Sequence, residues 1–364
     1  MDLAANFFEK ADVLKNCDFK KLKELSLHIE NIDILKEVNF PELTSLSLSH
    51  GGISNINVLQ EVNFKKLKIL YLSHNRISNI NILQNVNFNE LKELYLGCIY
   101  ISNFKFLEKV NFTNLNILYL GNNSISNIDF LEKVNFNELE ELDLNRNEIS
   151  NINVLEKVKF NKLKTLILEY NKISNISVLE KVKFNKLKTL NLENNKISDI
   201  SVLGKVNFSE LKELQLGANR ITNINILAKV DFKELELLEL YSNKLKDISI
   251  LDKVNFKKLS TLNLYINEIS DINALGKANF EELNSLDLSN NKITDIKVLE
   301  KVKFKKLNKL NLSHNSINDI SVFNKTNFKD LNNLNLSRNK INQKDYSSII
   351  SKLKTEIKEF DIYD

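Results

Sequence analysis

A phenylalanine that recurs every 24 residues constrains this chain more than any other feature of its sequence. The series runs without interruption from Phe40 to Phe328, and Phe19 precedes Phe40 by 21 residues. Repeats of this length cannot bury an apolar face alone, so they stack on their neighbours. The 364 residues are therefore expected to form one elongated solenoid with a continuous core, rather than two ordinary globular domains.

Each repeat divides into two halves with different periods. One copy reads Leu67-x-x-Leu70-x-Leu72-x-x-Asn75-x-Ile77-x-x-Ile80-x-x-Leu83-x-x-Val86-x-Phe88. The alternation around Leu70 predicts a short strand, and the spacing of the last apolar residues predicts one or two helical turns. Capping boxes such as Ser177-x-x-Glu180 should begin these turns. The fold class is thus an α/β solenoid, with a parallel β-sheet on the concave face and short helical turns on the convex face.

An asparagine follows the strand in most repeats, where the chain turns inward. The column comprises Asn75, Asn123, Asn147, Asn171, Asn195, Asn219, Asn243, Asn267, Asn291, Asn315 and Asn339. A buried amide can bond the backbone groups that such a turn leaves without partners, so each of these side chains should be buried and hydrogen-bonded. The column is broken at Glu30, Gly51 and Ile99, and the turn from Cys98 to Tyr100 should deviate from its neighbours.

The run from Asn195 to Leu203 reads Asn-x-Ile-Ser-Asp-Ile-x-x-Leu. With it the chain resembles the leucine-rich repeat proteins, and it is similar both to the bacterial internalin type and to the eukaryotic phosphatase-regulatory-subunit type. The repeat of this chain is longer than the repeats of both types, because it contains an additional Val-x-Phe segment. The resemblance covers about residues 20–345 and implies a horseshoe or arc that binds other proteins. The matching residues are all core residues, so no partner-contacting residue carries over.

The repeat register also divides the chain. Residues 1–18 are expected to form an N-terminal helical cap and half repeat. Residues 19–342 should hold fourteen leucine-rich repeats, mostly of 24 residues. Residues 343–364 should form a C-terminal helix and a final strand that cap the stack, because Tyr346, Ile349, Ile350 and Leu353 make an apolar stripe.

Composition argues against several functions. The net charge is +4, so nothing indicates nucleic-acid or membrane binding, and no apolar stretch approaches ~18 residues. Enzyme and cofactor motifs are absent, which predicts a non-enzymatic protein without cofactors. Cys17 and Cys98 lie in different repeats, and no signal peptide is visible. A reducing, cytoplasmic compartment and a monomer are therefore expected.

Outward strand positions supply the candidate binding residues. Two apolar clusters and two rim tyrosines are predicted to contact a protein partner, namely Ile69, Tyr71, Tyr95, Tyr100, Ile117, Tyr119, Tyr170, Leu237, Tyr241, Tyr265 and Ile266. Exposed tyrosines suit interfaces because they bury a large area for few rotatable bonds. The alternative is cross-strand stacking that only stabilises the sheet. Carboxylates lie between the clusters, at Glu141, Asp143, Glu169, Glu193, Glu213 and Glu239, and favour a partner with a basic middle.

Two further columns have other interpretations. His50, His74 and Cys98 share one repeat position, so a metal-binding or enzyme-associated module is the alternative from another class. Three ligands in a line converge poorly on one ion, and no metal site is predicted. Lysines recur on the convex side from Lys109 to Lys325, but glutamates precede five of them, which indicates a mixed, solvated face.

The sequence thus predicts a non-enzymatic scaffold or adaptor that binds a protein on its concave sheet. The resemblance to the phosphatase-regulatory type implies a cytoplasmic adaptor. The resemblance to internalins implies the alternative, a secreted bacterial factor that binds host proteins.

Overall fold

The computed structural model describes residue 15 and residues 18–326 and 328–363. These residues belong to two compact units. Unit 1 comprises residues 1–173 and 181–185, and unit 2 comprises residues 174–180 and 186–364. Apart from Lys15 and Asp18, the cap expected over residues 1–18 lies outside the described residues.

Each unit is built on a parallel sheet in which consecutive strands pair in register. Leu70, for example, lies opposite Leu94, and Leu94 lies opposite Leu118. The strands of unit 1 are β1 (Glu24–Ser26), β2 (Ser45–Ser47), β3 (Ile69–Tyr71), β4 (Glu93–Tyr95), β5 (Ile117–Tyr119), β6 (Glu141–Asp143) and β7 (Thr165–Ile167). Those of unit 2 are β8 (Thr189–Asn191), β9 (Glu213–Gln215), β10 (Leu237–Glu239), β11 (Thr261–Asn263), β12 (Ser285–Asp287), β13 (Lys309–Asn311), β14 (Asn333–Asn335) and β15 (Glu359–Asp361).

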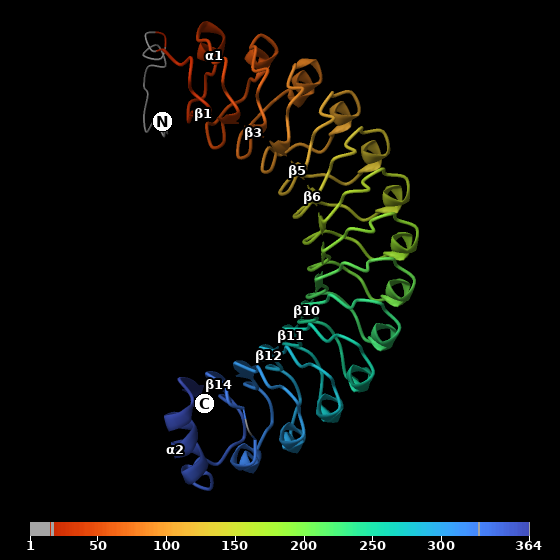
Figure 1. Ribbon diagram of the computed structural model, residues 1–364, viewed down its shortest axis with the longest axis vertical. Helices are drawn as coiled ribbons and strands as arrows, with labels where there is room; N and C mark the ends of the chain where they lie inside the picture. The colour runs from red at the N-terminus through yellow and green to blue at the C-terminus, as the bar shows by residue number, and fades with distance from the viewer. Residues whose placement is uncertain (1–14, 16–17, 327, 364) are drawn as a thin grey trace. The chain divides into compact units, whose positions relative to one another are not determined.

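The helical half of most repeats is a short 3₁₀ helix on the outer side of each unit, opposite the strands (Figure 1). Unit 1 holds α1 (Ile34–Glu37), η2 (Asn57–Gln60), η3 (Ile80–Asn85), η4 (Lys105–Glu108), η5 (Asp129–Glu132) and η6 (Asn153–Glu156). Unit 2 holds η7 (Ser177–Glu180), η8 (Ser201–Gly204), η9 (Asn225–Ala228), η10 (Ser249–Asp252), η11 (Asn273–Gly276), η12 (Lys297–Glu300), η13 (Ser321–Asn324) and α2 (Ser347–Glu356). The predicted α/β solenoid is confirmed, with strands inside and helical turns outside. No helix of the described residues has both the length and the apolar character that a membrane span requires.

The predicted capping boxes are wrong. In η6 the amide of Asn153 donates to Oδ1 of Asn151 at 2.9 Å, and in η7 the amide of Ser177 donates to Oδ1 of Asn175 at 2.8 Å. The capping side chain therefore lies two residues before the helix. The glutamates instead reach the following repeat, as where Glu156 pairs with Lys181 at 3.1 Å.

The asparagine column bonds the backbone as predicted. Asn219 donates from Nδ2 to the carbonyls of Leu192, Leu216 and Gly217 at 2.9, 3.2 and 3.1 Å, and its Oδ1 accepts from Ile197. All eleven side chains form hydrogen bonds to backbone groups. Eight are buried, whereas Asn123, Asn291 and Asn339 are only half-buried. The prediction of burial is wrong for these three.

The residue before each column asparagine, and before Gly51 and Ile99 where the column is broken, has a left-handed backbone, whatever its side chain. Its φ lies between 48° and 61° at His50, His74, Cys98, Asn122, Arg146, Tyr170, Asn194, Ala218, Ser242, Ile266, Asn290, His314 and Arg338. Where the column is broken at Gly51 and Ile99, the next residue is also left-handed, with φ of 69° at Gly52 and 59° at Tyr100. The predicted deviation of the Cys98–Tyr100 turn is confirmed.

Replacing Ile266 with asparagine should stabilise unit 2 by about 1 kcal/mol, because a β-branched side chain is strained at positive φ. Ile266 has φ of 51° and is 41% exposed, so little packing is lost. Asn290 occupies the same position in the next repeat with φ of 53°. Chemical unfolding of Ile266→Asn and of the reverse variant Asn290→Ile should shift the midpoint in opposite directions. Midpoints that do not move would exclude strain at this position.

Candidate functional site

The strand face of unit 1 brings together three of the predicted binding residues in a stack. Tyr71, Tyr95 and Tyr119 lie opposite one another in the register of β3, β4 and β5. The first two rings stack with centroids 4.5 Å apart, and the second and third are tilted with centroids 6.2 Å apart. We call these residues the tyrosine stack. Ile69 and Ile117 lie on the same face and are half-buried.

The tyrosine stack is half-buried, not exposed as the sequence suggested. Each ring covers its neighbour, because parallel strands are only ~4.8 Å apart. The Tyr95 hydroxyl donates to Oε2 of Glu93 at 3.0 Å. Burial and this bond raise the pKa of Tyr95, and burial raises the pKa of Tyr71 and Tyr119. The stack therefore stays neutral at physiological pH, and it also contributes to the stability of the sheet, as the alternative interpretation proposed.

Two glycines leave the space that the ring of Tyr119 occupies. A Cβ atom on Gly97 would overlap the ring of Tyr119, and one on Gly121 would approach its Cζ at 3.0 Å. Sequence analysis missed both residues. The sequence does contain a signal for them. Tyr119 is followed two residues later by Gly121, and a glycine, Gly97, also occupies the equivalent position of the preceding repeat. Gly217 holds the ring of Tyr241 in the same way in unit 2.

Carboxylates surround the tyrosine stack. Burial and the negative charge of Glu93 raise the pKa of Glu141. Asp143 is only 6% exposed, and its Oδ1 accepts from the amide of Asn145 at 2.8 Å. Burial, reinforced by the charges of Glu141 and Glu169, raises the pKa of Asp143 to about 6. The outward residues of β2–β7 include no lysine or arginine, so this face is both apolar and acidic.

The remaining candidate residues lie outside the stack. Tyr100 is 76% exposed on the deviating turn after β4. Tyr170 is 43% exposed, and the guanidinium of Arg146 lies 4.1 Å from its ring centroid. In unit 2, Leu237, Tyr241 and Tyr265 are half-buried and Ile266 is exposed. The structure places Leu237 on β10 and the other three on the turns that follow β10 and β11.

The histidine and cysteine column does not present a metal site. The rings of His50 and His74 stack face to face with centroids 4.1 Å apart, at an interplanar angle of 13°. Burial raises the pKa of the Cys98 thiol, which disfavours the thiolate that binds metals. Over residues 18–326 and 328–363, no group of three or more His, Cys, Asp or Glu side chains could hold an ion.

Five lysines of the outer column form ion pairs with glutamates of the preceding repeat, namely Lys133, Lys157, Lys181, Lys205 and Lys325. Within unit 1, Glu108 pairs with Lys133 and Glu132 pairs with Lys157, at 3.5 and 3.1 Å. Within unit 2, Glu180 pairs with Lys205 at 3.0 Å. A mixed, solvated outer face, as the sequence indicated, fits these contacts better than a continuous basic stripe.

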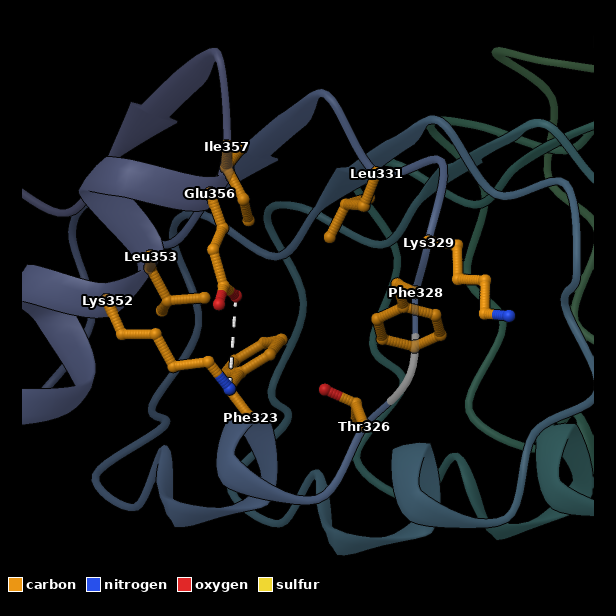
Figure 2. A pocket seen from close by; sticks show the side chains of 9 residues that line it. All are labelled: Phe323, Thr326, Phe328, Lys329, Leu331, Lys352, Leu353, Glu356 and Ile357. Atoms are coloured by element: carbon orange, nitrogen blue, oxygen red, sulfur yellow. Dashed lines mark ion pairs between the residues drawn. The ribbon is translucent and has the colours of Figure 1, made fainter.

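A hollow of 430 Å³ lies beneath α2 at the end of unit 2 (Figure 2). Its walls include Phe323, Leu331 and Leu353, and Lys352 pairs with Glu356 at 3.8 Å within it. It also exposes part of Phe328, whereas the equivalent Phe304 is 3% exposed. The charged groups drawn at this hollow are paired with each other or, like Lys329, point away from it (Figure 2). It therefore ranks behind the strand face as a candidate site.

Comparisons with known proteins agree with this architecture. A family model described as Leucine Rich repeats (2 copies) matches residues 161–205 and 281–325, and one described as Leucine Rich Repeat matches residues 66–86. No curated protein sequence matches the chain. These repeats and the parallel strands of each unit define a leucine-rich repeat protein with the solenoid fold of that class.

Solved structures specify the type of repeat. An internalin of Listeria monocytogenes is 26% identical with a TM-score of 0.68, and the match covers 97% of this chain and 92% of that one. A leucine-rich repeat protein of Leptospira interrogans is 25% identical with a TM-score of 0.76, over 94% and 84% of the two chains. TLR13 in a complex named TLR13–ssRNA13 is 22% identical with a TM-score of 0.70, over 94% and 50%. The chain is a leucine-rich repeat protein of the internalin-like type.

Proposed function

We propose that this chain is a protein-interaction scaffold and that it binds a protein partner on the strand face of unit 1. The leucine-rich repeat fold is typically a non-enzymatic interaction fold, and the internalin-like neighbours support this role. The observation that carries the proposal is the tyrosine stack, which keeps three large aromatic rings partly accessible on one rigid sheet. Rigid aromatic residues of this kind dominate the binding energy of many interfaces.

The strand face of unit 1 favours a protein over a nucleic acid. Glu93, Glu141 and Asp143 lie on it, and the outward residues of β2–β7 include no lysine or arginine. Phosphate groups bind to proteins mainly through lysine and arginine, so a nucleic-acid backbone would be repelled here. We therefore expect that this face does not bind RNA, although the name of the TLR13 complex includes an RNA.

A variant that copies one repeat into the next tests the proposal. Ser45-Leu46-Ser47 of β2 pairs in register with Ile69-Leu70-Tyr71 of β3, so Ile69→Ser/Tyr71→Ser repeats a sequence that the fold already contains. Because two apolar side chains are lost from the face, we expect its affinity for a captured partner to fall by about 2 kcal/mol, or about 30-fold. Pull-down from a lysate should identify the partner, and calorimetry should measure the affinity.

The control is Lys181→Gln on the outer side, which removes an ion pair with Glu156 and leaves the strand face intact. Circular dichroism should verify that both variants fold. If the control loses the partner and the strand-face variant retains it, the proposed binding face is wrong and the outer side becomes the site.

A further inference from the structure

The strand face of unit 1 carries an apolar side chain between two carboxylates. Ile117 of β5 lies opposite Glu93 of β4 on one side and opposite Glu141 of β6 on the other. At ~4.8 Å per strand, the two carboxylates start from backbone positions about 10 Å apart. Ile117 is half-buried and forms the floor between them.

The charges of this arrangement are unbalanced. Among the ion pairs of the described residues, none involves Glu93 or Glu141. Glu93 accepts a hydrogen bond from the neutral Tyr95 hydroxyl, which leaves its negative charge uncompensated. Burial raises the pKa of Glu141, and the negative charge of Glu93 raises it further. A cation placed between them would relieve this repulsion.

We infer that the partner segment bound on this face carries a lysine or arginine that lies over Ile117, with its charge between Glu93 and Glu141. The alkyl stem of such a side chain packs on Ile117 and on the edges of Tyr95 and Tyr119, and the head group remains near the carboxylates. A cation beside tyrosine rings gains a further favourable contact. This inference rests on the proposed function and specifies the chemistry of the partner: a basic, apolar polypeptide segment.

A random dodecapeptide library displayed on phage is the probe, selected against the full chain. We expect the enriched sequences to contain lysine or arginine beside aliphatic or aromatic residues. A synthetic copy of one enriched peptide should bind Glu93→Gln/Glu141→Gln at least tenfold more weakly than the wild type. Exchanging its lysine or arginine for norleucine should weaken binding to the wild type by a similar factor. The same exchange should have little effect on the double variant, because the interaction is already lost.

Glu108→Gln/Glu132→Gln is the matched control, since it removes two negative charges from the outer side of the same unit. Affinity equal to that of the wild type would show that the loss depends on position and not on net charge. Enriched peptides without a cation, which still lose affinity for Ile69→Ser/Tyr71→Ser, would overturn the inference and leave the proposed function standing. Peptides that bind all variants equally, or a selection that enriches nothing, would count against both.

Discussion

Replacing Asn219 with leucine is expected to lower the free energy of unfolding by about 3 kcal/mol, because it leaves a buried amide without a partner. Leucine has the same branched arrangement of side-chain heavy atoms as asparagine but no polar atoms. The amide of Ile197 donates to Oδ1 of Asn219 at 2.9 Å, and Asn219 is only 8% exposed. Water therefore cannot easily replace the lost oxygen.

The carbonyl groups that accept from Asn219 keep other hydrogen-bond donors after the same substitution. Leu192 still accepts from Asn195 Nδ2 at 3.1 Å, and Leu216 still accepts from Asn243 Nδ2 at 3.0 Å. The penalty is thus concentrated on the Ile197 amide, which makes the prediction specific. Amide hydrogen exchange should show Ile197 opening faster than the equivalent Ile221, whose partner Asn243 is unchanged.

One repeat of the chain naturally lacks the column asparagine, so the opposite substitution can be tested there. At the break in the column, Ile99 offers no oxygen to the amide of Ile77, which is the position equivalent to Ile197. Ile99→Asn should therefore raise the unfolding midpoint if the turn returns to the geometry of its neighbours. Chemical unfolding of both variants checks the pair of predictions. An Asn219→Leu chain that unfolds at the wild-type midpoint would show that these bonds contribute little.

The asparagine column was predictable because one residue type recurs at one position of a repeat whose period is unbroken. Its hydrogen bonds require only that the chain turn inward after a strand, which the alternation of leucines already implies. The left-handed residue before it was not predictable from residue type. That position is occupied by Arg146, Tyr170 and Ile266 as well as by asparagine, so stacking of the repeats, not local preference, imposes the conformation.

The candidate site was predicted in part. Register alone placed Tyr71, Tyr95 and Tyr119 side by side, because a constant period aligns equivalent residues on neighbouring strands. Their half-buried state depends on ring orientation and on the space above Gly97 and Gly121, which no pattern of apolar residues encodes. The capping boxes failed for a related reason. The amide of Asn153 already donates to Oδ1 of Asn151, and the next repeat offers Glu156 a lysine instead.

Replacing Asp143 with asparagine is expected to stabilise the folded chain at pH 7 by up to about 3 kcal/mol. Burial raises the pKa of this carboxyl group from its ordinary 3.8 to about 6. A tenfold change in proton affinity corresponds to about 1.4 kcal/mol. Because the folded chain holds this proton more tightly than the unfolded chain, ionisation at neutral pH favours unfolding.

The pH dependence has a definite sign. Below about pH 4 the group is protonated in both states, and its ionisation costs nothing. As the pH rises from about 4 to about 6, the unfolded chain ionises first, and the stability of the wild type falls. Above about pH 6 the cost is complete and constant. The difference between Asp143→Asn and the wild type should therefore be small at pH 4 and largest above pH 6.

Asparagine already occupies the position equivalent to Asp143 in unit 2, so the substitution should fit. Asn191 is also 6% exposed, and its Oδ1 accepts from the amide two residues later at 3.0 Å, as the Oδ1 of Asp143 does. The matched control is Asp287→Asn. Asp287 accepts at Oδ1 from the amide of Ser289, and at Oδ2 from Nδ2 of Asn311 at 3.0 Å, a bond that a second amide would lose. We expect no stabilisation in that variant. Denaturant unfolding at pH 4, 5, 6 and 7 measures both variants, and a stability difference for Asp143→Asn that stays the same at every pH would refute the assignment of a raised pKa to this buried carboxyl group.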